Sequence, residues 1–210
     1  MFYFVIMPFF IHMLIHWSCC LYFYILDLIY LDSNNKNWIN YTKATRTSLC
    51  NQLFISLPTL YFLSGLLEKS VETSIDDTWI ITIIKLFLII NLANIFFYLT
   101  HRLLHHELIY KYIHYKHHEF IEPVAVSALY AHPIEHLVAN ILSFLCPLIL
   151  IGTHYNLIIL LLILGTIQTV LAHVKYIYST NDHTIHHKLY KYNYGFGGYI
   201  DKLFLTYKYE

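Results

Sequence analysis

The sequence predicts an all-α fold, a multi-pass transmembrane helical bundle with a histidine-rich cap. Of the 210 residues, 58% are hydrophobic and 12% are charged, and the mean hydropathy is +0.52. This composition is too apolar for a soluble domain of this size. The chain also carries 15 histidines, which gather between and after the apolar segments. Because the formal net charge is zero, we expect no nucleic-acid partner.

Several apolar segments predict the helices of this bundle, since about 20 helical residues cross a bilayer core. The first and third segments are long enough to span it, and the second is marginal by length. The last two form an expected antiparallel hairpin that is short for a full crossing. The segments are 2–31, 53–67, 79–100, 137–151 and 155–172. No repeat, linker or composition shift divides the chain, so we predict one domain over residues 1–210.

The charges between these segments predict which side of the membrane each loop occupies. The stretch 32–50 is net basic, and the stretch after the second segment is net acidic. Positively charged loops stay in the cytoplasm, so 32–50 is expected there, and the later crossings then bring 101–136 and 173–210 to the same side. The charged residues are Lys36, Lys43 and Arg46 against Asp32 in the first stretch, and Glu68, Glu72, Asp76 and Asp77 against Lys69 in the second.

Eight histidines form three short motifs, or boxes, in the two histidine-rich regions. Residues at i, i+3 and i+4 share one helix face, with Cβ atoms about 5–6 Å apart, so two rings can reach one metal or two adjacent metals. At this histidine content about 0.075 copies of H-x-x-H-H are expected by chance, yet the chain has two. The boxes are His101-Arg-Leu-Leu-His105, His114-Tyr-Lys-His117-His118 and His183-Thr-Ile-His186-His187.

The first two boxes cannot share one straight helix. His101 and His114 would lie about 20 Å apart along it at 1.5 Å per residue, whereas paired catalytic metals lie about 3.5–4 Å apart. The helix must therefore end between the boxes, and we expect the turn near residues 107–111.

Further candidates lie outside the boxes. Three histidines are candidate ligands or hydrogen-bonding supports for ligands, two roles that the residues leave open, and two carboxylates are candidate supports. These residues are His132, His136, His173, Glu135 and Asp182. The carboxylate at position 182 is equally a candidate helix N-cap. Eleven candidate imidazoles exceed the three or four ligands of a single zinc site, so the count favours two metals, although imidazole suits Fe, Zn, Cu and Ni alike. His12 and His16, within the first apolar segment, are expected to have structural roles, and His106 and His154 are expected to be bystanders.

The boxes resemble those of the sterol desaturase/fatty acid hydroxylase superfamily, which carries H-R-x-x-H and two copies of H-x-x-H-H on the cytoplasmic face of a helical membrane domain. The similarity is strongest over 101–136, where Ile109-Tyr-Lys-Tyr-Ile-His114 and Tyr130-Ala-His-Pro-Ile-Glu135 look like the C-4 methylsterol oxidases. Ile200-Asp-Lys-Leu-Phe204 is similar to the closing motif. The chain departs from that pattern at Val174-Lys175, usually Ser-Gly, and at Leu205, usually Gly.

This resemblance implies a membrane-bound oxygenase of the endoplasmic reticulum type that oxidises a C–H bond of a lipid, a C-4 methylsterol above all. It implies two iron ions held by the eight box histidines, O2 as oxidant, and electrons from NAD(P)H through a separate cytochrome b5 or reductase. The departures affect the expected lipid pocket more than the expected metal ligands.

Other functions share parts of this pattern. Within the superfamily the alternatives are a fatty-acyl hydroxylase, a sterol desaturase or an alkylglycerol-type monooxygenase, which box spacing does not separate. From another class, a membrane metal transporter or a zinc-dependent hydrolase also gathers histidines, but a transporter is expected to hold ligands near the bilayer midplane. An inactive scaffold is a third alternative, against which the intact boxes argue.

Overall fold

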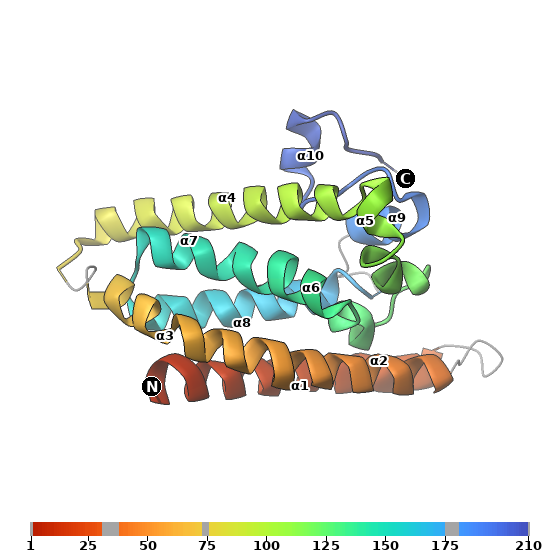
Figure 1. Cartoon of the computed structure of the whole chain (residues 1–210), viewed down its shortest axis with the longest axis horizontal. Coiled ribbons are helices and arrows are strands. Elements are labelled where there is room, and N and C mark those ends of the chain that lie inside the picture. Colours follow the sequence, from red (N-terminus) through yellow and green to blue (C-terminus); the bar gives the residue numbers. More distant parts are fainter. Residues whose placement is uncertain (1, 31–37, 73–75, 175–180, 210) are drawn as a thin grey trace.

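The computed structural model describes residues 2–30, 38–72, 76–174 and 181–209, which form helices and no strand. Long helices lie side by side along the molecule (Figure 1). They are α1 (Met7–Tyr30), α2 (Trp38–Asn51) continued by η3 (Gln52–Ser56) and α3 (Leu57–Glu72), α4 (Trp79–Leu104), α6 (Pro133–Glu135) continued by η6 (His136–Leu142) and α7 (Ser143–Ile151), and α8 (Tyr155–Leu171). The short elements are η1 (Phe2–Ile6), α5 (Glu107–Tyr110), η4 (His114–Glu119), η5 (Ala125–Leu129), α9 (Asn181–Leu189) and α10 (Tyr199–Leu203).

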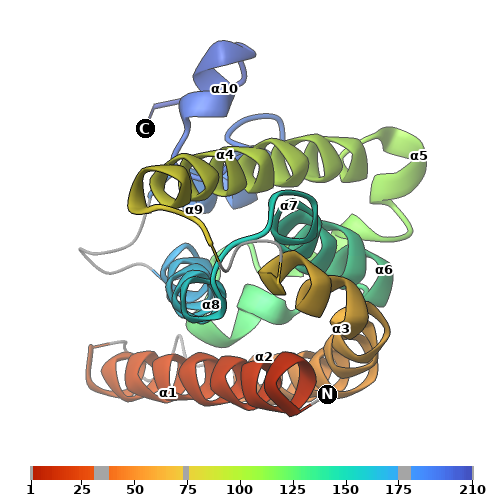
Figure 2. The ribbon, with the colours of Figure 1, turned by 90° about the vertical axis from the view of Figure 1, so that its left-hand side faces the viewer.

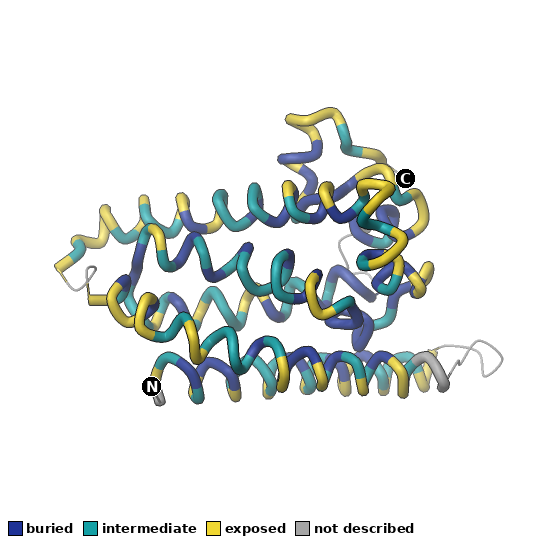
Figure 3. Tube along the Cα trace, viewed as in Figure 1, coloured by how far each residue is buried: buried dark blue, intermediate teal, exposed yellow. Residues whose placement is uncertain are grey.

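The predicted multi-pass bundle is confirmed by the length and composition of these helices. Four of those described are long and apolar enough to cross a membrane, namely Tyr3–Tyr30, Tyr41–Glu72, Trp79–Leu104 and Pro133–Ile151, and Tyr155–Leu171 is a shorter apolar helix. Figure 3 shows that exposed positions recur along the outer helices. Many are large and apolar, such as Phe62 at 79% exposure and Ile83 at 57%, as expected where lipid replaces water.

The second helical unit is longer than the sequence predicts. The segment 53–67 belongs to a helix that already begins at Trp38. Most of the expected basic loop 32–50 is therefore helical. Lys43, which the sequence assigned to that loop, lies in α2 and forms an ion pair with Glu119 of η4. A search for apolar segments does not detect α2, because this helix has a polar face that packs against η5 and not against lipid. Leu31, Asp32 and Lys36 lie outside the described residues.

The predicted hairpin begins four residues early, at Pro133. Proline suits the first turn of a helix because it has no N–H to leave unpaired, and the His132 side chain caps that turn by accepting from the Ile134 N–H. The chain turns at Gly152, with a φ of 73°, before α8 begins. Helix α7 then packs against α4 and α3, whereas α8 packs against α1 (Figure 2). The two arms of the hairpin therefore line different walls of the bundle.

Both histidine-rich regions lie at one end of the bundle. In Figure 1 the segments α5 and α9 lie beside the end of α4, at the end where α2 begins, while the N-terminus and the turn between α7 and α8 lie at the other. The sequence predicts that both regions lie on one side of the membrane, and in the structure both lie at one end of the helical bundle.

Buried hydrogen bonds from α2 hold η5, which links the second box to α6. Ser48 Oγ donates to the Val126 carbonyl at 3.2 Å. The Asn51 side chain donates to the carbonyls of Leu129 at 3.1 Å and Ala131 at 3.0 Å, and it is only 2% exposed. A buried carbonyl that loses its donor costs about 1–3 kcal/mol, so this helix fixes the segment through polar contacts.

We expect Asn51→Ala to lower the free energy of unfolding by about 2–4 kcal/mol, because two buried carbonyls lose their donor. Asn91→Ala is the matched control, since the Asn91 amide donates to Phe87 of its own helix at an exposed position. Thermal unfolding of the purified protein in detergent measures both. Equal midpoints for the two variants would contradict the anchoring role.

Candidate metal centre

Helix α4 ends between the first two boxes, as the distance between His101 and His114 along a straight helix requires. Helix α4 stops at Leu104, and His105 is its C-cap. The break at 105–106 lies just before the expected 107–111, and the short α5 fills most of that range. His106 caps α5 by accepting from the Leu108 N–H at 3.4 Å. The second box then forms the 3₁₀ helix η4, which turns its rings back toward His101.

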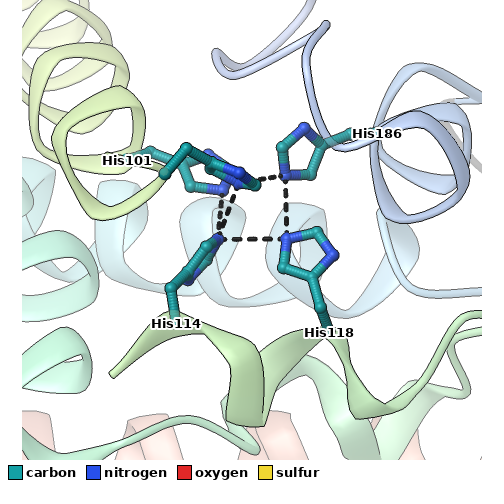
Figure 4. A group of neighbouring side chains, drawn as sticks. His101, His114, His118 and His186 are labelled. Carbon is teal, nitrogen blue, oxygen red and sulfur yellow. Dashed lines mark hydrogen bonds between the residues drawn. The ribbon is translucent and has the colours of Figure 1, made fainter. Parts of the chain in front are cut away.

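Nine histidines gather in two groups, and within each group the ligand atoms lie within 4.8 Å of one another. Each of the last two boxes contributes to both groups, because positions i, i+3 and i+4 diverge enough to face two neighbouring centres. Figure 4 shows rings of group one, from α4, η4 and α9, pointing toward one another. Group one is His101, His105, His114, His118 and His186, and group two is His117, His173, His183 and His187.

Backbone carbonyls orient four of these rings, two in each group. A carbonyl oxygen only accepts, so the bonded Nδ1 must carry the hydrogen, and in the neutral ring Nε2 is then left with its lone pair. These bonds therefore aim Nε2 into the groups. They run from His101 to Tyr194 (2.7 Å), from His186 to Tyr192 (2.6 Å), from His117 to Tyr130 (3.1 Å) and from His173 to Thr169 (2.8 Å).

The inward nitrogens of group two face each other without a proton between them. His117 Nε2 lies 3.3 Å from His173 Nε2, and both rings carry their hydrogen on Nδ1. Burial lowers the pKa of His117 to about 4 and that of His173 to about 3, so both rings are neutral near pH 7. Two lone pairs in contact repel each other, and a bound cation would relieve the repulsion.

The spacing in both groups fits metal coordination. Neighbouring Nε2 atoms lie between 2.9 and 3.3 Å apart. Imidazole nitrogens bind metals at about 2.0–2.1 Å, which places two ligands at right angles about 3 Å apart. His118 and His187, where the groups meet, also have a buried Nδ1 with no hydrogen-bond partner in the described structure, and their ring centroids are 4.6 Å apart. The imidazole nitrogens fit two metal ions, but they do not determine which metal is bound.

Of the two candidate carboxylates, only Glu135 lies at the groups. It is 4% exposed, and its Oε1 lies 2.9 Å from His114 Nδ1, off the direction of a hydrogen bond. Burial holds the pKa of His114 well below its ordinary value, so the ring is neutral and the contact is not an ion pair. The Glu135 Oε2 has no hydrogen-bond partner in the described part of the chain. Asp182 lies inside the first turn of α9 and does not cap it. It accepts from the Tyr207 hydroxyl at 2.9 Å, so it ties α9 to the C-terminal segment.

Of the three histidines with open roles, only His173 joins a group. His132 caps α6, as described above. His136 bonds Ser56 Oγ at 2.9 Å through Nε2 and the Asn140 amide at 3.3 Å through Nδ1, and neither nitrogen reaches the groups. The two histidines differ from His173 because their ring nitrogens are engaged by the Ile134 N–H, Ser56 and Asn140, partners that sequence spacing does not reveal.

Sequence reasoning missed the role of Asp201. This carboxylate is fully buried and accepts from the N–H groups of Tyr194 at 2.7 Å and Gly195 at 2.8 Å. It thereby fixes the Tyr194 carbonyl that orients His101. A side chain at position 195 would place its Cβ 3.0 Å from the same carboxylate. The only signal in the sequence is that Asp201 lies within the closing motif.

The sequence profile of the fatty acid hydroxylase family matches residues 86–206, more than half of the chain. The chain belongs to the fatty acid hydroxylase family. The range shared with other fatty acid hydroxylases contains all nine histidines of the two groups.

Individual relatives carry several activities in their names. Fatty acid hydroxylase domain-containing protein 2 of Homo sapiens is 36% identical over 169 residues, which cover 77% of this chain and 50% of that protein. Methylsterol monooxygenase 1 of Gallus gallus is 31% identical over 67% of this chain and 48% of its own length. A delta(7)-sterol 5(6)-desaturase of Gibberella zeae is 31% identical over 67% of this chain and 47% of its own. The chain spans about half the length of these relatives. No solved structure matches it.

We expect Asp201→Asn to expose the Tyr194 and Gly195 amides to solvent. One amide oxygen cannot replace two carboxylate acceptors, and a hydrogen bond to a charged group contributes about 1.5–3 kcal/mol. Hydrogen exchange followed by mass spectrometry should show at least about tenfold faster exchange over 193–196. Asp77→Asn is the matched control, because Asp77 pairs with Lys85 at the other end of the bundle. Unchanged protection in Asp201→Asn would refute the anchoring role.

Acid should destabilise the metal-free protein. Burial lowers the pKa of His105 to about 2, of His117 to about 4 and of His173 to about 3, whereas the unfolded histidines titrate near about 6.5. As the pH falls through that value, the unfolded chain takes up protons that the folded chain refuses, so stability present above it is lost toward pH 4. Thermal midpoints of chelator-treated protein at pH 7.5 and 5.5 measure this loss. His106→Gln is the control, because His106 lies outside both groups, and it should show the same loss of stability. Thermal midpoints that do not change with pH would contradict this prediction.

Proposed function

We propose that this chain is a membrane-bound, O2-dependent di-iron oxygenase that oxidises a C–H bond of a lipid, the C-4 methyl group of a methylsterol. The observation that carries the proposal is the position of the two histidine groups beside an apolar cavity of about 560 Å³. Pockets for lipid-sized ligands have this volume range and this apolar character. The relatives named for methylsterol and sterol oxidation support the substrate class.

The cavity leads toward the histidines. Its walls come from α1, α3, α4, α7 and α8. A small pocket of about 30 Å³ continues it, sharing Phe97, Asn140, Thr169 and Phe196 among its walls. The other walls of the small pocket include histidines of both groups and Glu135. A lipid in the cavity therefore has one direction in which it can approach the candidate metal centre.

Group one and group two would each hold one iron ion. Bound iron would supply O2 activation, which no protein side chain supplies. The chain itself keeps the imidazoles neutral through burial, aims their Nε2 atoms inward and positions the lipid. Phe97 and Phe196, stacked with ring centroids 4.0 Å apart, exclude water where the cavity meets the site.

The proposed reaction needs electrons from a separate donor, which we assign to a cytochrome b5 or reductase supplied by NAD(P)H. Two half-buried tyrosines lie between the surface and group one. The Tyr190 ring is 4.8 Å from that of His118, and the Tyr110 ring is 5.5 Å from that of His105. Exposed lysines surround this pair in sequence, at positions 111, 188 and 191. Their positive charge suits an acidic donor protein, and we propose that this end faces the cytoplasm from an endoplasmic-reticulum-type membrane.

A metal transporter fits the structure less well. Transporters bind their ions near the bilayer midplane, whereas both groups lie where α4 ends and just beyond α8. Within the family, a fatty-acyl hydroxylase, a sterol desaturase and an alkylglycerol-type monooxygenase use the same kind of histidine boxes. Product analysis separates these activities from methylsterol oxidation.

In cells that lack their own C-4 methylsterol oxidase, we expect this chain to consume 4,4-dimethylsterols and His117→Ala to reduce consumption at least about a hundredfold. The variant removes one ligand of group two, and losses of catalytic function commonly reach this size. Sterol profiling by mass spectrometry at matched protein levels is the measurement. His106→Ala, which alters a histidine outside both groups, should retain activity. Persistent dimethylsterols with abundant intact protein would contradict the substrate assignment.

A further inference from the structure

The cavity beside the metal centre is polar at one end and apolar at the other. Polar side chains on four helical units line the part of the cavity nearer the histidine groups, among apolar neighbours such as Ala139 and Ile167. At the other end the lining includes Tyr155, whose hydroxyl is occupied by the Tyr3 carbonyl. The polar residues are His12 on α1, Ser56 on η3, His136 and Asn140 on η6, and Thr166 on α8. Further from the groups the corresponding walls are Phe4, Leu67, Leu145 and Ile158. A lipid that fills this cavity would place its polar part toward the metal centre.

Two hydrogen-bonded sets fix the polar end. His12 bonds Thr166 Oγ1 at 3.0 Å and the Gln52 amide at 3.3 Å. Across the cavity, His136 bonds Ser56 at 2.9 Å, and the Asn140 amide nitrogen lies 3.3 Å from His136 Nδ1. An amide nitrogen only donates, so His136 Nδ1 is the acceptor there. The Asn140 carbonyl oxygen has no partner within the described structure and is available to accept a hydrogen bond.

The cavity selects a neutral polar group. None of the described residues that line it is Asp, Glu, Lys or Arg. Moving a carboxylate or phosphate into such a site without a charged partner is strongly unfavourable. A hydroxyl needs only an acceptor for its hydrogen, and the Asn140 carbonyl is such an acceptor.

We propose that Asn140 accepts a hydrogen bond from a hydroxyl group of the lipid substrate, so that the lipid binds with its hydroxyl end toward the metal centre and the oxidised methyl group is attached to the carbon next to the one that bears the hydroxyl. Asn140 lines both the cavity and the small pocket walled by His101, His117 and His173. A hydroxyl at Asn140 is therefore next to both groups, and the hydrocarbon body extends into the apolar end. The oxidation of that methyl group rests on the proposed function, but the binding mode does not.

Binding to the purified, metal-free full-length protein tests this mode. The probes are a radiolabelled 4,4-dimethylsterol and its 3-O-methyl ether, which has the same body but no hydroxyl hydrogen to donate. We expect the intact protein to bind the free sterol about tenfold more tightly than the ether, the ratio that one hydrogen bond supplies. Asn140→Leu should bring the two affinities within about twofold of each other while ether binding persists, which shows that the variant is folded. Asn91→Leu, the same change outside the cavity, should keep the preference.

Equal affinities in the intact protein, an unchanged preference in Asn140→Leu, or no binding of either sterol would overturn the proposal. The outcome is separable from that of the proposed function. A hydroxyl preference without oxidised product in the sterol profiles leaves the binding mode standing and rejects the oxidation. Oxidised product without a hydroxyl preference supports the proposed function and rejects the binding mode.

Discussion

Nine imidazole rings lie in one buried volume with their Nε2 atoms 2.9 to 3.3 Å apart, and the rest of the structure holds them there. Four of these Nε2 atoms carry lone pairs because their Nδ1 donates to a backbone carbonyl, and the pair from His117 and His173 repel each other unless a cation lies between them. Burial prevents the rings from relieving the repulsion by taking up protons, because a charged ring would lose its hydration. A metal ion bound among the rings would relieve this repulsion, and every helix or loop that keeps the rings in place would contribute to the affinity for it.

The frame around the rings is made of buried polar bonds. Four rings are aimed by backbone carbonyls, and those carbonyls belong to segments that other side chains fix. Asn51 holds the stretch before the Tyr130 carbonyl and Asp201 holds the Tyr194 carbonyl. In a membrane-embedded protein such bonds are retained because water does not compete for either partner. The positions of the candidate metal ligands thus depend on residues of α2 and of the C-terminal segment that contact none of these histidines.

The same bundle shapes the route by which a lipid would reach the site. Because α7 packs toward α4 and α8 packs toward α1, the two arms of the hairpin leave a cavity between their lining side chains. The cavity ends at Phe97 and Phe196, directly before the small pocket beside the histidines. A hydrophobic molecule would enter along the helices, while the exposed lysines near Tyr110 and Tyr190 lie on the outer surface of the histidine end. Lipid access and electron supply would therefore use different faces of one centre.

Hydropathy and helical spacing are local properties that survive in any packing, so they predict the all-α membrane class and the three boxes, and the loop charges predict that the boxes share one side. The distance between His101 and His114 along a straight helix also requires the helix to end between them. Contacts between distant segments, in contrast, establish that each of the last two boxes contributes to two groups, that His173 joins a group while His132 and His136 do not, and that Asp201 supports His101. These outcomes depend on contacts between residues as far apart as 101 and 194, and no local pattern records which backbone carbonyl a distant ring will meet.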